Sequence, residues 1–306
     1  LYSIKMFQTG WFRILFILAI LMVCFLWYKR QDLSNYYEGF VQDSPYVFKN
    51  NHRQFDQFYA EIYNQLMIPQ ERCTFEVEKI IEMTQPTNRS SFLDIGSGTG
   101  ELPGYLAKKG FDSYALDISK DMIQYINTNH SGVQTKCDNA KNSLTYEKGS
   151  FTHITMTGLS FYLFENKDEI LRNCFYWLKP GGYLVLHLID REKFDPIIPG
   201  GKPSLLNNPQ QYASHRITDT NIDFVDFQYR GSYDFSKNNQ MCLKETFTDD
   251  LTKHVRQQET KLYVEPMTHI MNMASKCGFI PHGQVTFANS CYFDEHQFLV
   301  ILERGQ

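Results

Sequence analysis

The sequence has little concentrated charge of either sign. Its 306 residues carry a formal net charge of −4, and no run of Lys or Arg is longer than two residues. Proteins that bind nucleic acid usually gather basic residues in one segment or on one face. We therefore expect no nucleic acid among the partners of this chain.

The cysteines follow no pattern either. All seven are scattered, their number is odd, and none forms a C-x-x-C pair. This distribution argues against a disulfide framework or a zinc site and suits a reducing compartment. No group of His, Asp and Glu has the spacing of metal ligands, so we expect no metal.

One long apolar run stands near the beginning of the chain. Residues 11–28 read WFRILFILAILMVCFLWY, in which Arg13 is the only charged residue. The run is about as long as a bilayer-spanning helix must be, and Trp and Tyr lie at its ends. A buried core helix would seldom be apolar on every face. A cleaved signal peptide would need small residues after the run, and FLWYKRQDL has none.

These features predict three regions. Residues 1–30 are expected to form an uncleaved, single-pass membrane anchor, residues 31–50 a linker, and residues 51–306 one folded domain. Basic residues flank the apolar run on both sides, so the sequence favours neither face of the membrane.

The most informative stretch is residues 92–122. The apolar segment 92–95 leads directly into GSGTG at residues 96–100, a helix is expected from about Glu101, and a second apolar segment ends at Asp117. Strand, glycine turn, helix, strand and acid in this order predict a nucleotide-binding βαβ unit. The glycines let the backbone turn sharply and approach a ligand closely. Asp117 can then accept hydrogen bonds from both ribose hydroxyls.

The spacing indicates which nucleotide is bound. A dinucleotide fold usually shows G-x-G-x-x-G, which holds a pyrophosphate. Here the pattern is D-x-G-x-G-x-G, with Asp94 before the first glycine. A carboxylate at that place repels a pyrophosphate but can pair with an ammonium group. The stretch resembles motif I of the class I S-adenosylmethionine-dependent methyltransferases, with Asp117 at the position of their ribose-binding acid.

The resemblance covers about residues 55–190 and implies the fold. WLKPGGYLVL at residues 177–186 is similar to the region after motif III of this superfamily, whereas Thr152 stands where the family usually has an acid. The implied fold class is α/β: a Rossmann-like, seven-stranded sheet with one reversed strand and helices on both faces. Beyond the fifth strand, residues 191–265 begin with an irregular, proline-rich segment and continue with three segments of period two. We expect an antiparallel β insertion there that serves as a substrate lid.

The resemblance also implies S-adenosyl-L-methionine as the cofactor and names its site. YAEIYN at residues 59–64 is similar to a segment that caps the cofactor in many small-molecule methyltransferases, although plain core packing is an equal explanation for each tyrosine. Asp138 occupies the position where the family places an acid against the adenine amino group. The expected cofactor-binding residues are Tyr59, Tyr63, Asp94, Gly96, Ser97, Gly98, Gly100, Asp117, Ile118, Met122, Asp138, Asn139 and Thr157.

The expected reaction is an in-line displacement that depends on positioning and on the exclusion of water. A base is needed only if the nucleophile arrives protonated. His187 and Asp190 lie near the carboxyl end of the fifth expected strand, where open α/β sheets bind ligands. Either can orient the acceptor or take its proton, and a packed strand histidine is the alternative for His187.

Methyl transfer to a nitrogen or oxygen atom of a small molecule is therefore the predicted function. A membrane-anchored, catalytically inactive methyltransferase-like binding or scaffold module is the alternative. We expect the catalytic domain on the cytoplasmic side of its membrane, because the cofactor is made in the cytosol.

Overall fold

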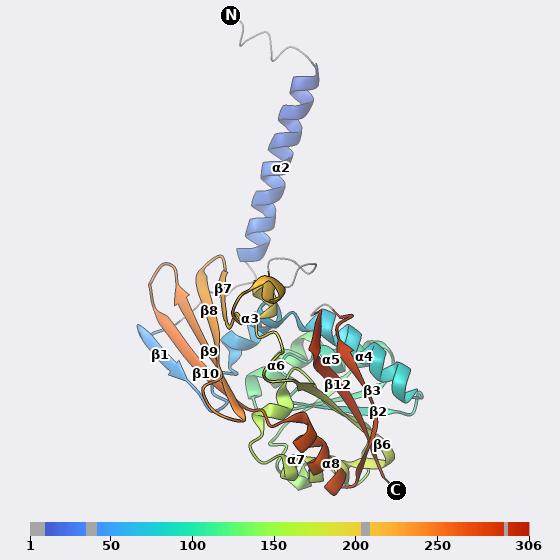
Figure 1. Ribbon diagram of the computed structural model, residues 1–306. Helices are drawn as coiled ribbons and strands as arrows, with labels where there is room; N and C mark the ends of the chain where they lie inside the picture. Colours follow the sequence, from blue (N-terminus) through green and yellow to red (C-terminus); the bar gives the residue numbers. More distant parts are fainter. Residues whose placement is uncertain (1–9, 35–41, 203–208, 291–292, 306) are drawn as a thin grey trace, which may run out of the picture. The chain divides into compact units, whose positions relative to one another are not determined.

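The computed structural model describes residues 10–34, 42–202, 209–290 and 293–305 (Figure 1). The chain divides into two compact units, Leu1–Asp43 and Ser44–Gln306. The first unit contains helix α2 (Gly10–Ser34), along which the side chains of residues 14–26 are exposed. Within the described residues, no helix is both long and apolar enough to cross a membrane. The structure thus gives no support to the expected membrane anchor.

The expected linker, residues 31–50, has more structure than its composition indicates. Helix α2 continues to Ser34, and strand β1 (Tyr46–Lys49) lies in the second unit. Residues 35–41 lie outside the described part of the chain.

The second unit is built around a seven-stranded sheet with the order β11-β12-β6-β5-β2-β3-β4. Neighbouring strands from β6 to β4 are parallel, whereas β12 is antiparallel to both β6 and β11. The predicted Rossmann-like sheet with one reversed strand is therefore confirmed. Its strands are β2 (Ser91–Ile95), β3 (Asp112–Asp117), β4 (Val133–Cys137), β5 (Phe151–Met156), β6 (Leu178–Ile189), β11 (Phe279–Phe287) and β12 (Asp294–Arg304).

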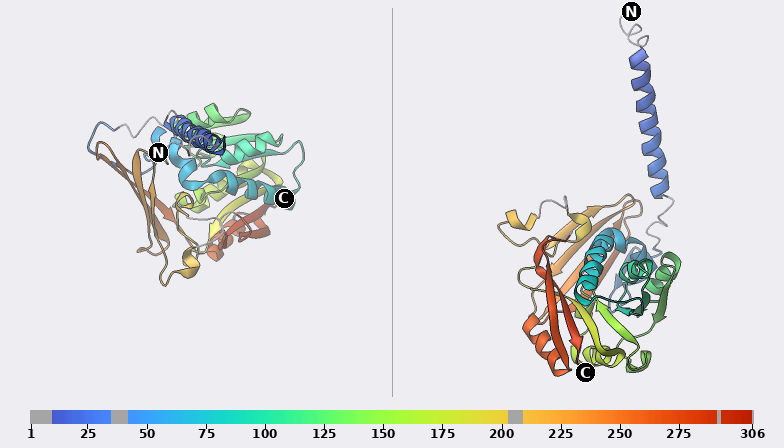
Figure 2. Two further views of the ribbon diagram at one scale, coloured as in Figure 1. Left: turned by 90° about the horizontal axis from the view of Figure 1, so that it is seen from above. Right: turned by 90° about the vertical axis from the view of Figure 1, so that its right-hand side faces the viewer.

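Helices cover both faces of this sheet (Figures 1 and 2). On one face, α4 and α5 pack through Val77 and Leu106, and α6 packs through Ile126. On the other face, α7 and α8 pack through Trp177 and Ile270. The α-helices of the second unit are α3 (Gln57–Met67), α4 (Pro69–Thr84), α5 (Glu101–Lys108), α6 (Lys120–Asn129), α7 (Lys167–Trp177) and α8 (Met267–Lys276).

The helix starts follow local chemistry. Asp56, Ser119 and Asn166 each precede a helix and accept a hydrogen bond from a backbone N–H of its first turn. The described part of the chain also contains four short 3₁₀ turns: η2 (Ser143–Thr145), η3 (Ser160–Leu163), η4 (Pro199–Gly201) and η5 (Pro209–Tyr212).

The expected β insertion forms a second sheet. It has five strands in the order β1-β10-β9-β8-β7, with β7 (Asp219–Asp223), β8 (Phe227–Asp234), β9 (Gln240–Asp249) and β10 (Val255–Tyr263). Burial alternates along β9, where Leu243, Glu245 and Phe247 face inward. Helix α3 packs on this inner face, because Phe58 meets Phe247 edge to face at a ring-centroid distance of 5.2 Å. The sequence indicated neither β1, which pairs in parallel with β10, nor β7, which lies largely in the segment expected to be irregular.

Candidate functional site

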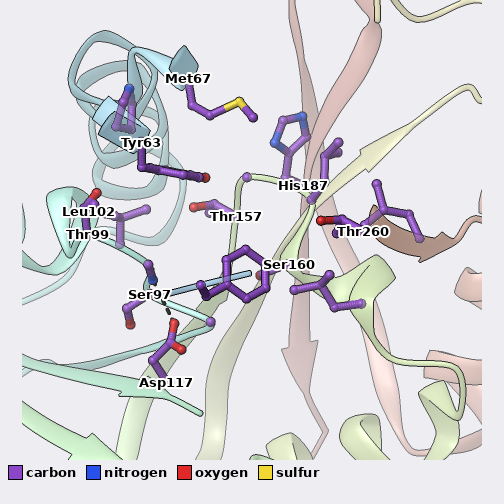
Figure 3. A pocket seen from close by; sticks show the side chains of 18 of the residues that line it. Tyr63, Met67, Ser97, Thr99, Leu102, Asp117, Thr157, Ser160, His187 and Thr260 are labelled. Carbon is purple, nitrogen blue, oxygen red and sulfur yellow. Dashed lines mark hydrogen bonds between the residues drawn. The ribbon is translucent and has the colours of Figure 1, made fainter. Parts of the chain in front are cut away.

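A cavity of about 270 Å³ lies at the carboxyl ends of the central parallel strands (Figure 3). Its walls come from α3, the start of α4, the loop after β2, the ends of β3 to β6, residues 194–202 and the inner face of the insertion sheet. This is the edge at which open α/β sheets bind ligands, and the volume approaches that of small-molecule sites.

At two glycines, the loop after β2 lines the cavity with backbone atoms alone. Gly96 and Gly98 have positive φ angles of 69° and 54° and line the cavity together with Ser97. A Cβ on Gly96 would lie 2.9 Å from Cβ of Ser160, so a larger residue cannot be placed there without a shift.

Gly100 has a different role from the one expected. As far as the structure describes the chain, it does not line the cavity. Its φ angle is 80°, and an added Cβ would lie only 2.7 Å from Cγ1 of Ile126. Gly100 therefore allows the start of α5 to pack tightly against α6, and the structure does not place it among the described residues that line the cavity.

Asp117 ends β3 beside the glycine loop. Its Oδ2 accepts the N–H of Gly98 and its Oδ1 accepts the N–H of Ser119, each at 2.9 Å. Burial raises the pKa of Asp117, while these backbone N–H groups oppose the rise. Each carboxylate oxygen keeps a further lone pair. The side chain can thus hold the loop and still accept a hydroxyl group from a ligand.

Asp94 lies deeper in the cavity wall. Its Oδ1 accepts a hydrogen bond of 2.7 Å from the hydroxyl of Thr155. Burial raises the pKa of Asp94 to about 7, with a smaller contribution from Glu76. A cationic ligand group beside Asp94 would favour the carboxylate form, so this position suits an ammonium group.

The two tyrosines of α3 lie differently. Both line the cavity, but the hydroxyl of Tyr59 donates to Glu245 of β9 at 2.9 Å and is thus directed into the insertion sheet. Glu245 is fully buried and also accepts hydrogen bonds from Tyr229 and Gln258. The ring of Tyr63 lies 4.0 Å from the position of a Cβ on Gly98, over the glycine loop.

Asn64 was not among the predicted site residues. Its Oδ1 accepts a hydrogen bond from the hydroxyl of Thr99 at 2.6 Å, and its Nδ2 donates to Oε1 of Glu101 at 2.8 Å. This side chain fastens α3 to the glycine loop. The signal was present in the sequence, since Asn64 is the last residue of the YAEIYN segment.

The remaining expected cofactor residues all meet at the cavity. Asp138 is held by two hydrogen bonds, one from the N–H of Asn139 at 2.7 Å and one from the hydroxyl of Thr145 at 2.9 Å. The lining residues of this group are Ile118, Met122, Asp138, Asn139 and Thr157.

His187 is buried in the cavity wall, and both of its ring nitrogens face other side chains. Because Gln297 donates its amide N–H to Asp294 at 2.9 Å, its oxygen faces Nε2 of His187 at 2.9 Å, and that nitrogen carries the proton. Nδ1 lies 3.7 Å from Oε1 of Glu76. Burial, together with Arg72, lowers the pKa of His187 to about 3. His187 is therefore neutral near pH 7 and a poor base.

Asp190 lies outside the cavity wall as described by the structure. Its side chain is 37% exposed, and its Oδ1 accepts the N–H of Glu192 at 3.1 Å. The residue begins the turn after β6, and its carbonyl oxygen accepts the N–H groups of Lys193 and Phe194. The position of Asp190 outside the described lining and the geometry of His187 both give little support to an acid–base role.

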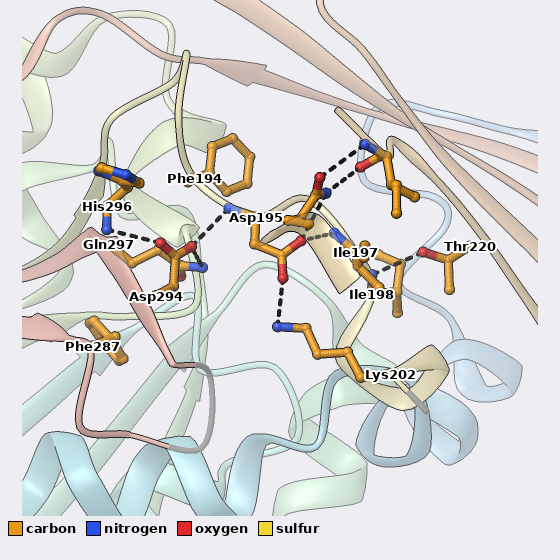
Figure 4. Close-up of polar contacts among 12 residues, drawn as sticks. Phe194, Asp195, Ile197, Ile198, Lys202, Thr220, Phe287, Asp294, His296 and Gln297 are labelled. Carbon is orange, nitrogen blue, oxygen red and sulfur yellow. Dashed lines mark hydrogen bonds and ion pairs between the residues drawn. The ribbon is translucent and has the colours of Figure 1, made fainter. Parts of the chain in front are cut away.

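Two cations of the cavity wall, Arg72 and Lys202, belong to buried ion pairs. Nε of Arg72 lies 3.4 Å from Oε2 of Glu76, one helical turn further along α4. Nζ of Lys202 lies 2.8 Å from Oδ2 of Asp195 (Figure 4). Burial raises the pKa of Glu76 to about 7 although Arg72 opposes the rise. The i, i+4 spacing of the first pair is visible in the sequence, whereas nothing in the sequence marks the second.

Residues 93–186 match the family model described as "Methyltransferase domain". Phosphoethanolamine N-methyltransferase of Plasmodium falciparum (isolate 3D7) is 31% identical over 113 residues, which are 36% of this chain and 42% of that protein. The putative methyltransferase YqeM of Bacillus subtilis (strain 168) is 23% identical over 233 residues, which are 74% of this chain and 87% of YqeM. The match thus spans less than half the length of the Plasmodium relative.

Solved structures share the fold. An S-adenosylmethionine-dependent methyltransferase from Clostridium acetobutylicum ATCC 824 gives a TM-score of 0.58 at 17% identity, covering 81% of this chain and 98% of its own. The S-adenosylmethionine-bound amino pentose methyltransferase CalS10 from Micromonospora echinaspora gives a TM-score of 0.57 at 15% identity. This match covers 81% of this chain and 97% of CalS10. The buried acid, the bare glycine backbone and Asp117 suit a ligand with an ammonium group, a ribose and no phosphate. Residues 93–186 are therefore similar to a methyltransferase domain, and the geometry of the cavity suits S-adenosylmethionine as its cofactor.

Proposed function

We propose that the unit Ser44–Gln306 transfers a methyl group from S-adenosylmethionine to a nitrogen or oxygen atom of a small molecule. The observation that carries this proposal is the continuity of the cavity, which joins the glycine loop and Asp117 to a second compartment under the insertion sheet. Figure 3 shows Asp117 on one side of the cavity and His187 and Thr260 on the other. One ligand can thus lie along the loop and a second can meet it inside the protein.

The cofactor end of the cavity is assigned by its donors and acceptors. Asp117 would accept the ribose hydroxyls, Asp94 would pair with the ammonium group, and Asp138 would lie at the adenine end. Gly96 and Gly98 let the ligand approach the backbone. When bound, the cofactor supplies a methyl group on a sulfonium, which is a good leaving group.

The protein itself surrounds the methyl acceptor. The 3₁₀ turn η4 packs directly on α3. A Cβ added to Gly200 would lie only 2.2 Å from the carbonyl oxygen of Gln65. Together with the insertion sheet, residues next to this turn line the acceptor compartment, and in-line displacement would benefit there from a fixed approach and from the exclusion of water.

Proton removal does not require the residues predicted for it. An amine that enters the apolar compartment has its pKa lowered by desolvation, which favours the neutral, nucleophilic form. His187 keeps its role as a packed, neutral wall of the site, stacked on Phe287 at a ring-centroid distance of 4.5 Å. The names of the Plasmodium relative and of CalS10 both refer to amino compounds, and this favours nitrogen as the accepting atom.

Calorimetry with S-adenosylhomocysteine and transfer of labelled methyl groups to a panel of small amines and hydroxyl compounds test the proposal. We expect binding of the demethylated cofactor and transfer to at least one acceptor. A chain that folds but does not bind S-adenosylhomocysteine would refute the proposal. Binding without transfer to any compound would favour the inactive binding module instead.

A further inference from the structure

We propose that the acceptor compartment selects methyl acceptors that carry neither a phosphate nor a carboxylate group. The inference rests on the proposed function and concerns the part of the cavity lined by Met67, Phe164, Phe194, Tyr233, Leu243 and Thr260. The acceptor is then an amine or hydroxyl compound with an apolar body.

The first buried cation is already committed to carboxylates. The side chains of Arg72 and Glu76 are 9% and 0% exposed, and their charged groups lie 3.4 Å apart. The guanidinium group of Arg72 also packs closely against Gly158. A Cβ added to Gly158 would lie only 2.6 Å from a terminal nitrogen of that group. Asp94 is a second carboxylate within the electrostatic reach of Arg72. An incoming anion would have to compete with both acids.

The second buried cation is fixed in the same way. Lys202 and Asp195 form an ion pair at 2.8 Å with side chains 8% and 3% exposed. Asp195 is itself held in place, because its Oδ1 accepts hydrogen bonds from the N–H of Ile197 and from the amide of Gln210 (Figure 4). Its own N–H donates to Asp294. Separating Lys202 from this carboxylate would leave a buried charge without compensation.

The third cation lies at the other end of the cavity. Lys141 is exposed and follows Asn139 in the turn after β4, which belongs to the cofactor end. Among the described lining residues, five carboxylates stand against these three cationic side chains, and His187 is neutral. The wall is thus unfavourable for an anion.

The consequence follows from solvation. A phosphate group leaves water at a large free-energy cost unless cations and hydrogen-bond donors replace its hydration. The acceptor compartment provides aromatic and aliphatic walls instead, which suit an uncharged body. Although the Plasmodium relative is named for phosphoethanolamine, the charges of this chain oppose that substrate.

A matched pair of ligands tests the inference. 4-Ethylphenol and 4-ethylphenyl phosphate have the same apolar body, and only the second carries a phosphate. Titrated into the full chain with saturating S-adenosylhomocysteine, the phenol should bind at least about tenfold more tightly than the phosphate ester. Tighter binding of the ester, binding of neither ligand, or methylation of phosphoethanolamine would overturn the inference.

Two variants connect the preference to the ion pairs. Asp195→Asn removes the negative partner of Lys202, and Glu76→Gln removes the negative partner of Arg72. Each variant should bind the ester more tightly than the wild type does, and the difference in affinity between phenol and ester should therefore become smaller. Asp190→Asn, which changes an acid outside the cavity, should leave the preference unchanged. If either cavity variant folds and keeps the wild-type preference, the ion pairs do not set it. The same titrations without S-adenosylhomocysteine separate this outcome from a failure of cofactor binding, which would refute only the proposed function.

Discussion

Replacing Asp117 with asparagine should weaken cofactor binding strongly while hardly changing the shape of the side chain. In the wild type, the two carboxylate oxygens accept the N–H groups of Gly98 and Ser119 at 2.9 Å each. An asparagine amide keeps only one oxygen, so its NH₂ group would face one of these donors. Either the glycine loop or the start of α6 would lose its hydrogen bond to residue 117, and the ribose would lose a charged acceptor.

The expected magnitude follows from these bonds. Hydrogen bonds to charged groups contribute about 1.5–3 kcal/mol each, and one such bond and part of another are lost. We therefore expect a loss of about 2–4 kcal/mol, which corresponds to a Kd for S-adenosylhomocysteine raised roughly 30-fold to 700-fold. Calorimetry near pH 7.5 measures this change directly.

Two acids serve as controls for this measurement. Asp138→Asn changes a partly exposed acid at the adenine end and should raise the Kd by less than about tenfold. Asp190→Asn should leave the Kd unchanged, since Asp190 lies outside the described cavity wall. An Asp117→Asn variant that is folded and binds as tightly as the wild type would refute the assignment of the ribose site.

Three further predictions concern stability and the division of the chain. Gly100→Ala should destabilise the fold by about 1–3 kcal/mol in urea unfolding, because the new Cβ meets Ile126; Gly110→Ala, with a positive φ but nothing within 4 Å, measures the backbone strain alone. The pKa of Glu76 rises from 4.5 to about 7 on folding, so the wild type should lose up to about 3 kcal/mol of stability between pH 4.5 and pH 7. The Glu76→Gln variant lacks this carboxyl group, so its stability should fall less over the same pH range. If the stabilities of both proteins fall equally with pH, the pKa of Glu76 is not raised on folding. Removal of residues 1–43 should leave the affinity for S-adenosylhomocysteine unchanged, since the cavity lies within Ser44–Gln306.

The parts of the site that the sequence predicted are those in which neighbours in sequence are also neighbours in space. Asp94, the glycines and Asp117 belong to one βαβ unit, and their spacing alone places them around a ligand. Gly100 shows the limit of such a pattern. It reads like the other two glycines, but its environment is set by Ile126 of the next helix.

The parts that the sequence did not predict depend on distant segments. His187 was a reasonable candidate base until Gln297, 110 residues away, fixed its proton and its orientation. Strand β1 is short, lies in a polar region and pairs with β10, which begins more than 200 residues later. Contacts of this kind leave no periodicity or spacing in the local sequence.

The two attachments of helix α3 have a consequence for redesign of the protein. Asn64 fastens α3 to the glycine loop, and Tyr59 fastens the same helix to Glu245 of the insertion. The insertion is therefore not an interchangeable module. A sheet transplanted from another protein to change the substrate would have to supply a buried hydrogen-bond acceptor opposite Tyr59, or the helix over the cofactor loop would lose its support along with the old specificity.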